Sequence, residues 1–234
     1  MNLTQELFKC SKEIARARSN VAPSAIAQPA LTQLQNLIKT EAINQIDRSL
    51  IIQSGCGMGS FADVPWIVIR DKRASINATS GFYISILFSK DGQRNYIALS
   101  AAAGASPTKA LKKRDFELIK KRAGELKEVS TQFIKSDYFS DRPVNLASDK
   151  PRPKAYTAGV AAYKEYIVDD LTKCNEDIFR HDLINFSQGY IKIVNSGFGK
   201  IEASEISKNQ SYKFTALHIS NFSSYCNKLS YVFN

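Results

Sequence analysis

The chain has 234 residues, 44% of them hydrophobic, which suffices for one sizeable core and argues for one compact domain. Lysine and arginine number 32 against 22 acidic residues, and the resulting formal charge of +10 favours a polyanionic partner. The N-terminal stretch mixes apolar and charged residues and no segment approaches the roughly 18 apolar residues of a membrane span, so we expect a cytoplasmic protein with no membrane partner.

The first half of the chain predicts two helices and then a sheet. Helical periodicity covers residues 3–17 and 30–47, with Pro29 as a breaker before the second helix. From Leu50 the pattern changes to short β-type runs, which are LIIQS, PWIVIR, FYISILFS and NYIALSA, separated by glycine or charged turns. These runs predict the strands of a small sheet.

The second half returns to helical spacing over residues 107–136. The segment SDYFSDRPVNLASDKPRPKA then reads as a long surface loop, and a loop of that length is often functional. A further helix is predicted over 168–195. We therefore expect an α+β fold, a small twisted mixed sheet flanked by helices, in a domain over 1–197, with an extension of unknown role over 198–234 packed on it.

Motifs for catalysis and cofactor binding are missing from the sequence. There is no Walker A motif, and two histidines, His181 and His218, are too few for an HNH nuclease cluster. Glu125-Leu126-Lys127 matches the E-x-K of metal-dependent nucleases but falls inside a predicted helix. We expect no cofactor, no metal and no catalytic residue. The cysteines form no CxxC pair and are interpreted as reduced packing residues, namely Cys10, Cys56, Cys174 and Cys226.

The run FYISILFS separates into two faces by the period of two in a strand. Phe82, Ile84, Ile86 and Phe88 form one apolar face, predicted to be core, and the other face is partly polar. On the preceding strand Trp66 and Val68 alternate with Ile67 and Ile69. If the two strands are neighbours, Trp66 could approach Tyr83. The alternative is that this tryptophan, the only one in the chain, is a core residue.

Lysines recur on one narrow face of the helix predicted over 107–136. Lys109, Lys113, Lys120 and Lys127 follow at spacings of four, seven and seven. The first three are candidate phosphate ligands, and a solvated helix face is the alternative.

The sequences GCGMGSFADVPWIVI, TSGFYISILFSKDG, NYIALS and AYTAG with its following YKEY resemble the N-terminal DNA-binding domain of McrB and related MrcB-like domains of modification-dependent restriction systems. The resemblance runs from about residue 10 to 197. It implies a module that binds double-stranded DNA containing modified cytosine, 5-methylcytosine or 5-hydroxymethylcytosine, by flipping the base into a pocket. A GTPase motor and a nuclease subunit or domain would then act as partners, and this chain would not cut DNA itself.

Carried over by matching positions, the resemblance implies that Trp66, Tyr83 and Leu87 line the base pocket, with Tyr156 as a further candidate. The glycine loop becomes a wedge that fills the vacated place in the base stack. In it Met58 stands where a family member places an aromatic side chain. The residues of this loop are Gly57, Met58, Gly59, Ser60 and Phe61.

Two other functions stay open at this stage. One is a module that binds DNA or RNA through the basic helix without flipping a base. The other is a magnesium-dependent nuclease, with Asp137, Asp141 and Asp149 of the long loop as metal ligands.

Overall fold

Five strands in the order β1-β2-β3-β4-β5 form the central sheet, and every neighbouring pair is antiparallel. The computed structural model describes residues 2–57, 60–104, 111–174 and 176–199. The predicted α+β fold is confirmed, and the sheet is antiparallel throughout rather than mixed. Its strands are β1 (Ile51–Gly55), β2 (Trp66–Arg70), β3 (Phe82–Phe88), β4 (Arg94–Ala101) and β5 (Val160–Ile167).

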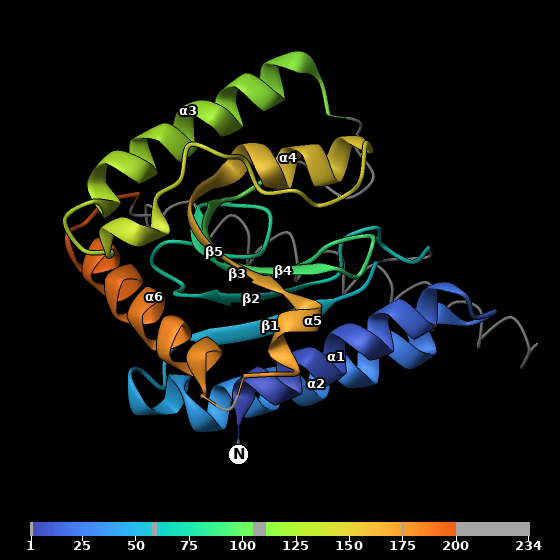
Figure 1. Cartoon of the computed structure of the whole chain (residues 1–234). Helices are drawn as coiled ribbons and strands as arrows, with labels where there is room; N and C mark the ends of the chain where they lie inside the picture. The colour runs from blue at the N-terminus through green and yellow to red at the C-terminus, as the bar shows by residue number, and fades with distance from the viewer. Residues whose placement is uncertain (1, 58–59, 105–110, 175, 200–234) are drawn as a thin grey trace, which may run out of the picture. The chain divides into compact units, whose positions relative to one another are not determined.

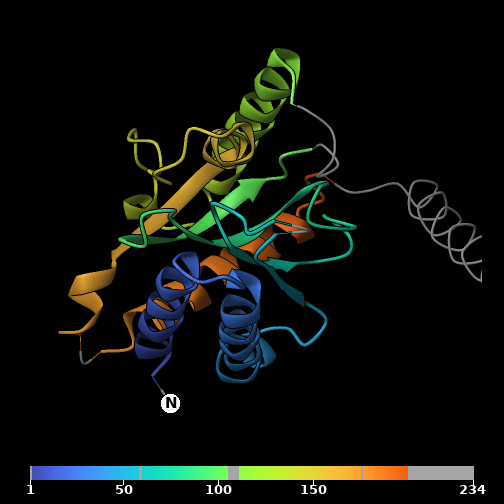
Figure 2. The same ribbon diagram turned by 90° about the vertical axis from the view of Figure 1, so that its right-hand side faces the viewer.

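Helices cover both sides of the sheet. The pair α1 and α2 lies on one side, and α3 and α4 lie on the other (Figure 1, Figure 2). Helix α6 packs against β3 and β4 and also contacts α1 and α3. The longer helices are α1 (Leu3–Arg18), α2 (Pro23–Glu41), α3 (Lys113–Ser130), α4 (Pro151–Gly159) and α6 (Ile178–Asn195), and the short ones are η1 (Ile43–Gln45), η2 (Ser136–Tyr138) and α5 (Val168–Leu171).

The alternation predicted for β3 is observed, and its apolar face lies on the side of the sheet that forms the main core. Phe82, Ile84, Ile86 and Phe88 belong to the large apolar cluster formed with α1, α2 and α6. Each such side chain contributes roughly 1.5–3 kcal/mol by leaving water. The intervening residues of β3 face the opposite side, where Leu87 and Tyr83 belong to two smaller apolar clusters, and Tyr156 of α4 packs in the cluster around Leu87.

One carboxylate, that of Asp177, links the N-termini of α1 and α6. Asp177 caps α6 by accepting a hydrogen bond from the Arg180 amide, and it also accepts from the Leu3 and Thr4 amides at 3.0 Å each. Two helix N-termini thus share one negatively charged cap, which suits the positive end of each helix dipole.

Helix α2 differs from the prediction because Pro29 lies inside it. The helix begins at Pro23, where the missing N–H costs nothing, and Ala27 and Leu31 pack into the core on either side of Pro29. Tertiary packing therefore outweighs the single backbone hydrogen bond that an interior proline removes.

The C-terminal half departs from the prediction at three places. The long loop ends in α4, and the following residues form β5, which the sequence analysis did not identify as a strand. The helix predicted over 168–195 is divided into α5 and α6 because Asp177 caps a new helix start. Of the helix predicted over 107–136, α3 is the regular part, and residues 105–110 lie outside the described residues.

The described part of the chain through Gly199 forms a compact unit. Of the predicted extension over 198–234, all but the first two residues lie outside the described residues, so its role and packing stay predictions. No helix in the described ranges has both the length and the apolar character needed to cross a bilayer.

Candidate functional site

A cavity of about 490 Å³ opens on the side of the sheet that carries Tyr83, Ser85 and Leu87. Strands β1 to β4, the loop after β1, the segment before β3 and helix α4 all contribute to its lining. The structure brings together all four side chains that the sequence analysis assigned to a pocket, because Trp66, Tyr83, Leu87 and Tyr156 all line this cavity.

The strand register explains why three of these side chains meet. Trp66 pairs directly with Leu87 across β2 and β3, and directly opposed residues of antiparallel strands project from the same face. Tyr83 lies four residues before Leu87 on that face, opposite Ser100 of β4. Tyr156 reaches the same region from α4 and packs in the apolar cluster that contains Leu87.

Trp66 is half-buried and lies between two small apolar clusters, one around Leu87 and one around Tyr83. Its indole packs over Gly55, its partner residue on β1. A Cβ atom added at Gly55 would lie 2.8 Å from the indole Cζ2 atom. The glycine therefore sets the position of the ring, a role that sequence reasoning missed. A glycine opposite the tryptophan in a predicted hairpin was the available signal.

The two tyrosines keep their protons at neutral pH. Tyr83 is 5% exposed, its hydroxyl donates to the Ala78 carbonyl at 2.9 Å, and burial raises its pKa well above the ordinary value. Burial also raises the pKa of Tyr156, and the nearby Arg152 guanidinium acts in the opposite direction. The cavity therefore offers neutral aromatic rings.

The predicted wedge loop is anchored at its base. The Ala62 amide donates to the Cys56 carbonyl at 2.7 Å, and Gly57 has a φ of +113°, in the left-handed region. Gly57 and Ser60 line the cavity, whereas Phe61 packs against the main core beneath the Arg18 guanidinium, 5.2 Å from the ring centroid.

The tip of this loop, Met58 and Gly59, lies outside the described residues. Phe61 is thus a packing residue in this structure, and the wedge assignment rests on the tip.

Asp63 fixes the segment that leads into β2. It accepts hydrogen bonds from the Ser148 hydroxyl at 2.6 Å and the Lys150 ammonium at 2.9 Å, and Lys90 Nζ lies 3.2 Å away. Burial alone would raise the pKa of Asp63, but these hydrogen bonds outweigh it and lower the pKa to about 2. The network holds the start of β2 against the segment that enters α4, so it aligns two walls of the cavity.

The predicted phosphate ligands do not line the cavity. Lys113 is the exposed first residue of α3, and Lys120 is exposed with its ammonium 3.6 Å from a Glu117 carboxylate oxygen. Lys109 lies outside the described residues. Among the described lining residues the cation is Arg152, which the sequence analysis did not name. Its spacing of four residues from Tyr156 was the signal, because that spacing places both on one face of a helix.

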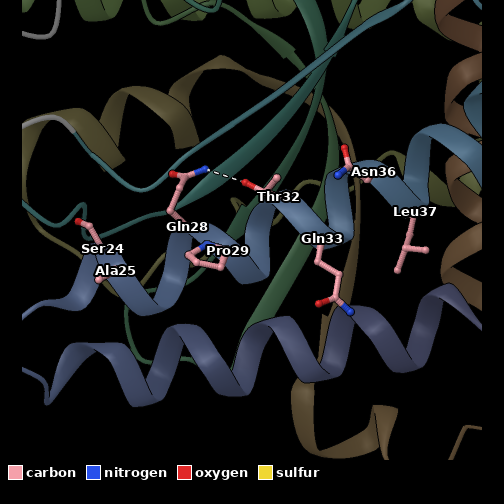
Figure 3. Close-up of a pocket in the computed structure, with 8 residues that line it drawn as sticks. All are labelled: Ser24, Ala25, Gln28, Pro29, Thr32, Gln33, Asn36 and Leu37. Atoms are coloured by element: carbon pink, nitrogen blue, oxygen red, sulfur yellow. Dashed lines mark hydrogen bonds between the residues drawn. The ribbon is translucent and has the colours of Figure 1, made fainter.

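A second depression runs along α2, and all of the described residues that line it belong to that helix (Figure 3). The side chains that form it are uncharged and include no aromatic ring among the described residues that line it. Gln28 is shared with the first cavity, where its amide donates to the Ser54 hydroxyl at 3.2 Å and its oxygen accepts from Cys56 Sγ at 3.3 Å. This depression lacks a surface on which a base could stack.

The alternative of a magnesium site finds no support in the loop carboxylates. Across the described ranges, no three histidine, cysteine, aspartate or glutamate side chains lie close enough to hold a metal ion. Asp141 and Asp149 are fully exposed, and their nearest charged partners are Lys127 at 3.8 Å and Lys154 at 3.3 Å. These aspartates do not converge with Asp137 on one point.

The model of the family described as MrcB-like, N-terminal domain matches residues 10–195 of the chain. The match includes all five strands and every residue assigned above to the cavity. No curated protein matches the chain significantly.

Proposed function

Since this chain belongs to the MrcB-like N-terminal domain family, a family of DNA-binding modules, we propose that it recognises modified cytosine in double-stranded DNA by flipping the base into the cavity beneath α4. The observation that carries the proposal is the convergence of three aromatic rings, Trp66, Tyr83 and Tyr156, on one cavity. The three come from β2, β3 and α4, which are distant in sequence.

The size and lining of the cavity suit an extruded base. An enclosed cavity of about 150 Å³ holds benzene, so 490 Å³ leaves room for a pyrimidine with substituents. Extruding a base costs a few kcal/mol, and stacking on aromatic side chains returns roughly 1–3 kcal/mol. Aromatic walls therefore offset much of the unstacking, and phosphate contacts supply the remaining affinity.

The preference for a modified base comes from apolar contact together with shape. A buried methyl group contributes about 0.8 kcal/mol, or roughly fourfold in affinity. Leu87 is 3% exposed and provides apolar surface at the cavity wall, where a 5-methyl or 5-hydroxymethyl group would pack.

Phosphate binding is assigned to basic residues of α4 and α3. Arg152 at the cavity and Lys113 and Lys120 on α3 are the described candidates, and Lys109 is a further one outside the described residues. The tip of the loop after β1, with Met58, fills the gap in the base stack. In this proposal a GTPase motor and a nuclease, as separate subunits or domains, carry out translocation and cleavage.

The test compares duplexes of one sequence that carry cytosine, 5-methylcytosine or 5-hydroxymethylcytosine at a single position. Wild type should bind a modified duplex more tightly, and Trp66→Ala and Tyr83→Ala should reduce this preference to parity while retaining the weaker, salt-dependent binding. Phe8→Ala, a half-buried ring on α1 across the sheet, is the matched control. Equal binding of all three duplexes by wild type would refute the proposal.

The same binding assay distinguishes base flipping from the alternative, a module that binds nucleic acid through its basic helix without flipping a base. Charge reversal at Lys113 and Lys120 would then abolish binding, whereas the pocket substitutions would leave it unchanged.

A further inference from the structure

One side of the cavity is formed by the second limb of the loop after β1, residues 60–63. Ser60 and Ala62 of this limb line the cavity. Phe61, which lies between them, packs against the main core on the other side of the sheet. The position of this part of the lining is therefore set by contacts that the limb makes away from the cavity.

Arg18, the last residue of α1, contacts the second limb at two points. Its guanidinium carbon lies 5.2 Å from the centroid of the Phe61 ring, and its Nη2 atom donates to the Asp63 carbonyl at 2.7 Å. A cation over an aromatic face and a short hydrogen bond from a charged donor are both favourable. Because the two contacts lie two residues apart on the limb, they fix its direction as well as its position.

The environment of Arg18 differs from that of an arginine that only ends a helix. A cation in the last turn interacts favourably with the helix dipole while it stays in water, as the exposed Arg16 does. Arg18 is half-buried instead, and burial lowers its pKa although the Asp63 carboxylate acts in the opposite direction. Its Nε atom is buried and has no hydrogen-bond partner among the described residues. A buried unpaired donor costs stability, and the two contacts with the limb offset that cost.

We propose that Arg18 is a positioning residue that holds the second limb at the cavity and thereby strengthens binding of the modified base. The inference rests on the base-flipping function proposed above. Arg18 is not among the described residues that line the cavity, so it acts through the limb. Release of the limb lowers the fraction of molecules with a complete cavity, and the apparent affinity for the modified base falls with that fraction. Phosphate contacts do not need a complete cavity, so binding of unmodified DNA is retained.

The experiment compares wild type with Arg18→Met on two duplexes of one sequence, with 5-methylcytosine or cytosine at a single position. Methionine keeps an apolar stem that packs on Phe61 and removes the guanidinium. Arg18→Met should bind the 5-methylcytosine duplex at least about threefold more weakly than wild type, because it lacks a hydrogen bond from a charged donor. Its affinity for the cytosine duplex should stay within about twofold of wild type. The ratio of the two affinities is the readout, because partial unfolding would lower both by the same factor.

Arg16→Met is the matched control. It removes the same charge from the same turn of α1, where Arg16 is exposed and paired with Glu13 at 2.6 Å, and it should leave the ratio at the wild-type value. The inference is overturned if Arg18→Met keeps the wild-type ratio, or if Arg16→Met lowers the ratio as much as Arg18→Met does. Equal binding of the two duplexes by wild type would instead overturn the proposed function.

Discussion

Replacing Gly55 by alanine should displace the Trp66 indole and weaken binding of modified DNA. The added Cβ would lie 2.8, 3.1 and 3.3 Å from three indole atoms, whereas ordinary contacts begin at 3.4 Å, so the nearest atom must retreat by 0.6 Å, the difference between 3.4 and 2.8 Å. Overpacking of this kind costs about 1–3 kcal/mol of stability. A displaced ring also loses much of the roughly 1–3 kcal/mol that stacking on a base contributes. A loss of about 1.4 kcal/mol corresponds to tenfold weaker binding of a modified duplex.

Trp66 is the only tryptophan, so its fluorescence reports the ring directly. Gly55→Ala should shift the emission maximum, and titration with a modified duplex should quench wild type more than the variant. Binding of the unmodified duplex should stay the same because phosphate contacts are retained.

Gly124→Ala is the matched control for this prediction. Gly124 is an exposed glycine inside α3, and its added Cβ would meet nothing within 4 Å. This variant should gain about 0.5–1 kcal/mol of stability and bind DNA as wild type does. The reasoning is refuted if Gly55→Ala leaves both the emission and the affinity for modified DNA at wild-type values.

Three further predictions concern the neighbouring groups. Tyr83→Phe removes the hydrogen bond to Ala78 and should lower the free energy of unfolding by about 1 kcal/mol, as measured by thermal unfolding. The affinity for a modified duplex should stay within about threefold of wild type. A loss of affinity as large as in Tyr83→Ala would contradict a stacking role for the ring. Asp63→Asn should destabilise the fold by about 2 kcal/mol at neutral pH. Because the pKa of Asp63 is lowered from 3.8 to about 2, the difference from wild type should shrink as pH falls across that window, and a constant difference in unfolding titrations would argue against ionisation as the cause. Lys113→Gln should weaken modified and unmodified duplexes equally and reduce the slope of log affinity against log salt by about one; a selective loss for the modified duplex would assign Lys113 to base recognition instead.

Four of the five strands and two walls of the cavity could be predicted because their signals are local. Strict alternation along β3 distinguishes Ile84 and Ile86 from Tyr83 and Leu87, and the pairing of β2 with β3 follows from adjacent short runs. Helical periodicity, likewise a local signal, placed the first helix within one residue of its observed ends.

The remaining features depend on contacts between distant segments. Strand β5 has residues on both faces that contact other elements, so it shows no clean alternation, and α4 is nine residues long with little amphipathic pattern. Pro29 is tolerated inside α2 because the flanking residues pack on the core. The hydrogen bond between the Ser85 and Ser100 hydroxyls and the Asp63 network join residues 15 or more positions apart, which no local pattern reveals.

The two faces of β3 allow recognition and folding to evolve separately. One face supplies the apolar contacts that hold the helices, and the other carries three positions, 83, 85 and 87, that border the cavity. Exchange at these three positions changes the chemistry offered to a ligand without removing a side chain from the main core. Substitutions at these positions can therefore change which ligand the cavity prefers while the apolar face that holds the helices keeps the same side chains.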